Sequence, residues 1–245
     1  MHLRYCTVVV AALALFVQHA YADLSLDLTT AGSSGTVNGA IYQQVPDQST
    51  GTGVIDSFVR IQHNGSEQGY NTDGSPFEFD EKGGAFTHSI TLGEVPILNI
   101  LGTDYRVFLL DINQVNSNDN HLLSLDSIKL FQNSAPDITH LSDLGSALYD
   151  LDGGGAATIE LDYSLNPGSG AGDMYAYIPD SLFTQNDDSY VYLYSAFGQP
   201  HATNDGFEEW AILKVDGDTR VPTPGAALLG LIGLCFVGRF KRATA

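Results

Sequence analysis

The sequence predicts an all-β protein organised as a single β-sandwich of jelly-roll-like type, with a different kind of segment at each end. Two observations predict the sandwich. Short segments with alternating or β-branched side chains recur along the chain, and clusters of Asn, Asp, Gly, Ser and Pro separate them. No long segment shows the 3.6-residue periodicity of an amphipathic helix. Composition changes near both ends, which divides the chain into residues 1–22, 23–219 and 220–245.

The first segment, residues 1–22, has the three parts of a secretory signal peptide. Arg4 supplies the positive start, residues 7–17 form the apolar run, and Ala20 and Ala22 are the small residues that a signal peptidase recognises. The alternative is an N-terminal membrane helix, but a span needs roughly 20 apolar residues and this run is shorter. We therefore predict export through the Sec translocon and cleavage by signal peptidase before Asp23.

Residues 23–219 contain the predicted strands. Residues 86–92 alternate, residues 105–112 are almost continuously apolar, and residues 190–197 are β-branched and aromatic. Residues 209–215 close the series. Weaker candidates are residues 24–28, 54–62, 97–101, 123–132, 158–163 and 173–178. Residues 31–53, rich in Gly, Ser, Thr and Gln, predict a loop or a poorly ordered insertion.

Charge and cysteine content exclude several classes of function. Residues 23–220 hold all 29 Asp and Glu residues against six Lys and Arg, a balance of −23. Such a field repels nucleic acid and anionic lipid and attracts cations, so we expect no nucleic-acid partner. Cys6 and Cys235 lie in the terminal segments, which excludes a disulfide or a cysteine zinc site within residues 23–219.

The C-terminal segment has three parts of distinct character. It begins with the motif Val221, Pro222, Thr223, Pro224, Gly225, continues with the apolar residues 226–238, and ends with the basic residues Arg239, Lys241 and Arg242. The two prolines favour an extended, protease-accessible strand. The apolar part could cross a thin bilayer, and the basic end would then remain in the cytoplasm. A plain single-pass anchor after a Pro-rich linker is the alternative.

This arrangement resembles the PEP-CTERM sorting signal of Gram-negative and related bacteria. Pro222 and Pro224 match the two prolines of that family, Val221 and Gly225 suit its flanking positions, and Thr223 stands where the family's motif has Glu. The resemblance implies recognition by exosortase, a transmembrane protease, and removal of the tail. Substrates in the family are commonly linked with extracellular polysaccharide and biofilm. The resemblance covers residues 220–245 and assigns no activity to the remainder of the chain.

Catalytic motifs are scarce between the two ends. The segment has no Gly-x-Ser-x-Gly elbow, no cysteine and no paired histidines. Glu208 and Glu209 beside Trp210 suggest a glycosidase pair, yet adjacent residues of a regular strand point to opposite faces. We therefore expect no enzyme activity, with a glycan-active enzyme as a remote alternative. The competing interpretation packs Trp210 in the core with the two acids at the strand entry.

Two binding sites can be proposed from residue pattern. Asp150 and Asp152 precede a glycine turn and offer oxygen ligands, so Ca²⁺ is the one cofactor that the sequence suggests; an ordinary acidic turn is the alternative. Tyr190, Tyr192 and Tyr194 lie on one strand face and, with Trp210, could stack on extracellular polysaccharide. Core packing explains these aromatic residues equally well.

Together these features predict an exported bacterial surface or extracellular-matrix protein with a structural or adhesive role. It would be held transiently in the inner membrane by the C-terminal sorting helix and would then reach the cell surface. The second interpretation is a carbohydrate-binding module of the same fold class.

Overall fold

The computed structural model describes residues 24–46, 55–170, 172–204 and 206–213. The predicted signal peptide, its predicted cleavage residues Ala20, Ala22 and Asp23, and the whole predicted sorting tail lie outside these residues, so what the sequence indicates for them stays a prediction. Within the described residues, no helix has the length and apolar character needed to cross a membrane.

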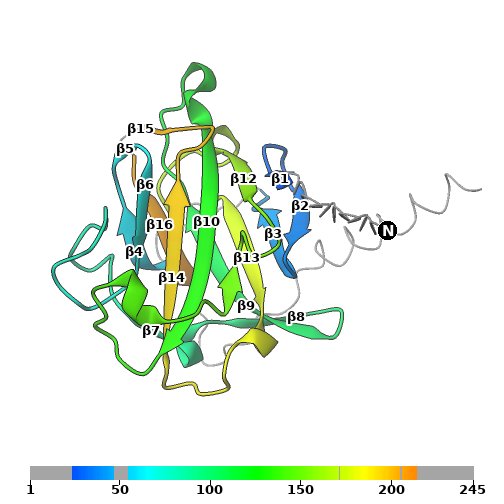
Figure 1. Cartoon of the computed structure of the whole chain (residues 1–245). Coiled ribbons are helices and arrows are strands. Elements are labelled where there is room, and N and C mark those ends of the chain that lie inside the picture. Colours follow the sequence, from blue (N-terminus) through cyan, green and yellow to red (C-terminus); the bar gives the residue numbers. More distant parts are fainter. Residues whose placement is uncertain (1–23, 47–54, 171, 205, 214–245) are drawn as a thin grey trace, which may run out of the picture.

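The described chain is built from two seven-stranded sheets and a small two-stranded one (Figure 1). Sheet A has the order β1 (Leu24–Asp27), β12 (Ala157–Asp162), β10 (Leu122–Asn133), β14 (Tyr190–Phe197), β6 (Glu67–Tyr70), with β11 (Tyr149–Asp150) on β10 and β7 (Ile90–Thr91) on β14. Sheet B has the order β2 (Ser34–Val37), β3 (Ala40–Gln44), β13 (Met174–Pro179), β9 (Thr103–Asp111), β16 (Glu208–Leu213), β4 (Ile55–Ile61), with β8 (Ile97–Ile100) on β9. The small sheet pairs β5 (Asn64–Gly65) with β15 (Thr203–Asn204).

All of the strand pairs among the described residues are antiparallel except β1 with β12, which is parallel. The helices in this part of the chain are single 3₁₀ turns: η1 (Leu92–Glu94), η2 (Asn118–His121), η3 (Leu141–Leu144), η4 (Tyr163–Leu165) and η5 (Asp180–Leu182). The all-β prediction is therefore confirmed for the described residues.

The two large sheets face each other across one hydrophobic core, which makes the fold β-sandwich-like. Phe108 and Trp210 of sheet B and Leu130 and Leu193 of sheet A belong to this core. Smaller apolar clusters cover the outer faces, around Tyr70 and Tyr192 on sheet A and around Tyr177 on sheet B. The central strands are thus buried on both sides, which explains why their sequences are almost continuously apolar.

The strongest strand predictions are confirmed as far as the described residues reach, since residues 105–112, 190–197 and 209–213 correspond to β9, β14 and β16. The prediction for residues 86–92 is wrong outside β7. Phe86 is 42% exposed beside the Arg60 guanidinium, and Thr87, expected on the polar face, is buried and accepts a hydrogen bond from the Arg60 amide. The backbone amide of Ser89 donates to Asp73 Oδ1, so bonds between side chains and backbone replace part of a regular ladder there.

The prediction of a loop over residues 31–53 is wrong for residues 34–44, which form the β2–β3 hairpin. Its turn is Asn38–Gly39, and both residues have positive φ, 47° and 84°. An Asn-Gly pair adopts this conformation at little cost, because Gly has no Cβ and Asn tolerates the left-handed region. The sequence contains this turn signal, but the polar composition around it obscures the strands.

Candidate functional site

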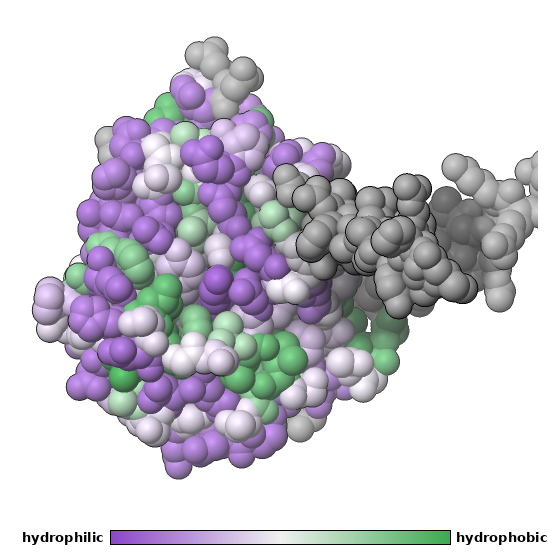
Figure 2. All heavy atoms as spheres, in the orientation of Figure 1, coloured by the Kyte–Doolittle hydropathy of each residue, from purple (hydrophilic) through white to green (hydrophobic). Residues whose placement is uncertain are grey.

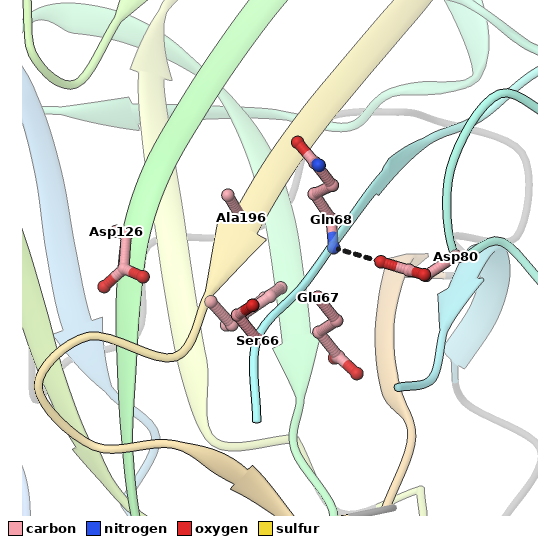
Figure 3. A pocket seen from close by; sticks show the side chains of 7 residues that line it. Ser66, Glu67, Gln68, Asp80, Asp126 and Ala196 are labelled. Atoms are coloured by element: carbon pink, nitrogen blue, oxygen red, sulfur yellow. Dashed lines mark hydrogen bonds between the residues drawn. The ribbon is translucent and has the colours of Figure 1, made fainter. Parts of the chain in front are cut away.

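A polar pocket of about 200 Å³ is lined by residues of β6, β10 and β14 in sheet A and by Ser66 and Asp80 (Figure 3). It is lined by Ser66, Glu67, Gln68, Asp80, Asp126, Ala196 and Phe197. Ala196 is paired with Gln68 on one side and with Ser127 on the other. Because the side chain of Ala196 is small, space for the pocket remains between β6 and β10.

Asp126 borders the pocket at a break in the register between β10 and β14, which falls between Leu125 and Ser127. One oxygen, Oδ2, accepts a hydrogen bond from the backbone amide of Gln199 at 2.9 Å, whereas the buried Oδ1 has no hydrogen-bond partner among the described residues. Burial, with a smaller contribution from the charge of Asp152, raises the pKa of Asp126 to about 6. An irregularity of this kind commonly redirects a side chain beside a site.

Asp80 borders the opposite side of the pocket, as Figure 3 shows. Its Oδ2 accepts a hydrogen bond from the backbone amide of Gln68 at 3.1 Å. The Gln68 side chain in turn accepts one from the Tyr194 hydroxyl at 2.6 Å. The pocket therefore presents carboxylate and amide groups, which suit the hydroxyls of a sugar or a positively charged group.

One lining residue of the pocket, Glu67, approaches a glutamate of the other sheet. Glu67 leaves β6 on the side opposite to Gln68 (Figure 3), and its carboxyl group lies close enough to that of Glu208, at the start of β16, for each group to influence the pKa of the other. Their exposed fractions are 2% and 0%. Burial raises the pKa of both carboxyls, and the neighbouring Glu67 raises that of Glu208 further.

The outer face of sheet B holds a second group of buried acids at the ends of β9 and β13. Asp173 Oδ2 accepts a hydrogen bond from the Ile112 amide at 2.8 Å, and Asp111 Oδ2 accepts one from the Gly170 amide. Burial raises the pKa of Asp111 to about 6 and that of Asp173 well above its ordinary value. These acids fix the glycine-rich turn before β13 to the sheet.

Trp210 does not lie on the face that carries the three tyrosines of the predicted carbohydrate-stacking surface. Trp210 is fully buried between the sheets and donates a hydrogen bond to Ser195 Oγ at 3.0 Å. Tyr190, Tyr192 and Tyr194 project from the other side of β14, where Tyr192 is fully buried and Tyr194 is 9% exposed. The inclusion of Trp210 with the tyrosines is therefore wrong, and core packing describes Trp210 and Tyr192.

The geometry gives the predicted Ca²⁺ site no support. Asp150 Oδ2 lies 3.3 Å from Lys129 Nζ, and Asp150 Oδ1 accepts a hydrogen bond from the backbone amide of Asp152 at 3.0 Å. Asp152 Oδ1 accepts the Ala157 amide at 2.9 Å. Among the residues that the structure describes, no group of three or more His, Cys, Asp or Glu side chains could hold a metal ion. The alternative of an ordinary acidic turn describes this loop.

Glu208 and Glu209 do point to opposite faces. Glu209 Oε1 lies 2.8 Å from an Arg60 nitrogen, whereas Glu208 faces Glu67 in the interior. They cannot face one cleft, as glycosidase chemistry would require.

Sequence reasoning missed Glu67, Asp80 and Asp126, because nothing in the local pattern around them indicates a partner. In comparisons with known proteins, no family model, curated protein or solved structure matches this chain.

Proposed function

We propose that this chain is an exported bacterial surface or extracellular-matrix protein with a structural or adhesive role, sorted by an exosortase-type protease. One observation carries the proposal: a residue pattern typical of a signal peptide, at residues 1–22, and the three-part tail pattern of residues 220–245 enclose a single acidic segment without cysteine. In this proposal the enclosed segment is a jelly-roll-like sandwich, flanked by the signal peptide and an apolar sorting helix.

The described domain is compatible with a structural role. Its aromatic side chains are largely used in the core and in the clusters on the outer faces. The face visible in Figure 2 is mostly hydrophilic, with small separate apolar areas. A stable, acidic and hydrophilic domain of this kind stays soluble at high local concentration, as a matrix component must.

Replacing Pro222 and Pro224 together with Ala is expected to block processing, because the motif loses the fixed extended backbone that the protease would recognise. Immunoblots of cell fractions would then show the variant at precursor mass in the membrane. Thr219→Ala, just outside the motif, serves as the matched control and should be processed normally. Unchanged mass and location in both the Pro variant and an exosortase-deletion strain would reject sorting by this route and favour a plain membrane anchor.

A carbohydrate-binding module is the second candidate function, and the pocket bordered by Asp80 and Asp126 is the observation that favours it. Asp126→Asn is expected to lower retention on extracellular polysaccharide about tenfold, the effect of weakening one hydrogen bond to a charged group. The measurement is a polysaccharide pull-down with the full chain. Asp188→Asn, an exposed turn residue, is the control. If the wild-type chain retains no polysaccharide, this function is rejected and the structural role stands alone.

A further inference from the structure

The carboxyl groups of Glu67 and Glu208 are buried and lie near each other, although the two residues belong to different sheets. Glu67 lies on β6 in sheet A, and Glu208 is the first residue of β16 in sheet B. We propose that the two carboxyl groups hold one proton between them, and that this proton is a structural link between the sheets.

The hydrogen bonds around the pair leave one buried oxygen of each carboxyl group without a partner among the described residues. Glu67 Oε2 accepts the His63 amide at 2.7 Å, and Glu208 Oε1 accepts Gln114 Nε2. The backbone amide of Asn113 also donates to Glu208. The two oxygens without a partner are Glu67 Oε1 and Glu208 Oε2. An ionised carboxylate only accepts hydrogen bonds, so one proton satisfies both remaining oxygens at once.

The charged surroundings do not neutralise a doubly ionised pair. None of the ion pairs among the described residues includes Glu67 or Glu208. The titratable groups that act on the pair are Asp80, which adds negative charge on the pocket side, and His63, whose ring nitrogen Nδ1 lies 3.0 Å from the Ser66 carbonyl oxygen. Two ionised carboxylates in contact inside a protein repel strongly, whereas a shared proton converts them into a charge-assisted hydrogen bond.

A metal ion between the same oxygens is the competing arrangement. Hard cations take six or more oxygen ligands, whereas Gln114 presents its NH₂ group to Glu208. The described part of the chain also contains no group of three acidic, His or Cys side chains that could hold a metal. These observations favour the proton.

The proton makes the contact between the sheets pH-dependent, and the sign follows from linkage. The pKa of each carboxyl is raised in the folded state, mainly by burial. Its contribution to stability is therefore fully present below the ordinary pKa of Glu, 4.5, and is lost as pH rises through the raised pKa. Alkaline conditions should weaken the link between β6 and β16.

Glu208→Gln tests the proposal, because the amide NH₂ can donate to Glu67 in place of the shared proton while the amide oxygen still accepts from Gln114. We expect the full chain carrying Glu208→Gln to melt near the wild-type temperature at pH 5. Its advantage over the wild type should increase with pH, to about 3 °C or more by pH 10. Glu67→Gln should behave in the same way. Fluorescence of Trp210, the only tryptophan, reports unfolding of the core.

The double variant Glu67→Gln/Glu208→Gln sharpens the test. With an amide at both positions, either two NH₂ groups face each other or one acceptor oxygen receives no hydrogen bond. The double variant should therefore melt below both single variants at every pH. Asp188→Asn removes one exposed negative charge and controls for the general effect of charge; its difference from the wild type should not depend on pH.

Three results would overturn the proposal. One is a Glu208→Gln protein that melts below the wild type throughout the pH range, or does not fold, while Glu67→Gln behaves likewise. Another is a double variant as stable as the single ones. The third is a wild-type melting temperature raised by Ca²⁺ with no such rise in Glu208→Gln, which would assign a cation to the site.

Discussion

Trp210→Ala is expected to lower the free energy of unfolding by about 3–5 kcal/mol, the typical cost of deleting a fully buried large aromatic side chain. Trp210 lies between the sheets with no exposed surface, and its indole N–H donates to Ser195 Oγ at 3.0 Å. The deletion removes apolar contacts on both sheets and leaves a cavity that the strands can fill only in part. Urea unfolding followed by far-UV circular dichroism measures the loss without requiring the tryptophan.

Trp210→Phe separates packing from hydrogen bonding. It keeps most of the ring volume but removes the N–H, so a smaller loss of about 1–3 kcal/mol is expected from the unpaired Ser195 hydroxyl. Adding Ser195→Ala should return part of that loss. A Trp210→Ala protein as stable as the wild type would mean that Trp210 is not in the core.

Arg106→Met is expected to cost a similar amount, about 3–5 kcal/mol, because it leaves several buried partners unpaired. Arg106 is 2% exposed, and its Nε lies 2.7 Å from Asp180 Oδ1. Its Nη1 donates to the carbonyl oxygens of Leu92 and Val95 at 2.7 and 2.9 Å. The guanidinium thus fixes η1 and η5 against β9, and chemical denaturation measures how much stability this contributes.

Lys129→Met is the matched control for this experiment. Lys129 and Asp150 form an ion pair in which both side chains are about one-third exposed, 35% and 33%. Water screens such a pair, so the expected loss is about 1 kcal/mol or less. Arg106→Lys should recover little, since an ammonium group cannot reproduce the planar fork. Equal losses for Arg106→Met and Lys129→Met would show that burial does not strengthen the Arg106 interactions.

Much of the fold follows from local patterns. The central strands β9 and β14 are predictable because they are buried on both faces. Their residues are therefore almost continuously apolar or aromatic, and this pattern is visible in the sequence alone. Residues 86–92 show the limit of such reasoning. Their alternation is clear, but Arg60, distant in sequence, binds Phe86 and Thr87 and changes which side chains are exposed.

The candidate site is less predictable, because strand periodicity assigns faces within one strand but not partners between strands. It correctly places Glu208 and Glu209 on opposite faces. It cannot show that Glu208 meets Glu67 on the other sheet, or that β14 separates Trp210 from Tyr192. The position of Asp126 depends on a register break in β10, which becomes visible only when its neighbour β14 is known.

The position of β16 has a mechanical consequence. It is the last described strand, yet it lies inside sheet B between β9 and β4. A pull on the C-terminal side of the chain therefore loads an internal strand held by antiparallel ladders along both edges. Force along the strand must shear these bonds together, and Trp210 must leave the core before β16 can slide. By contrast, β1 is a short, largely exposed edge strand at the other end of the described chain, and would peel away first. If the chain is tethered through its C-terminal end, as the proposed function implies, tension would therefore fall on a strand that is paired along both edges.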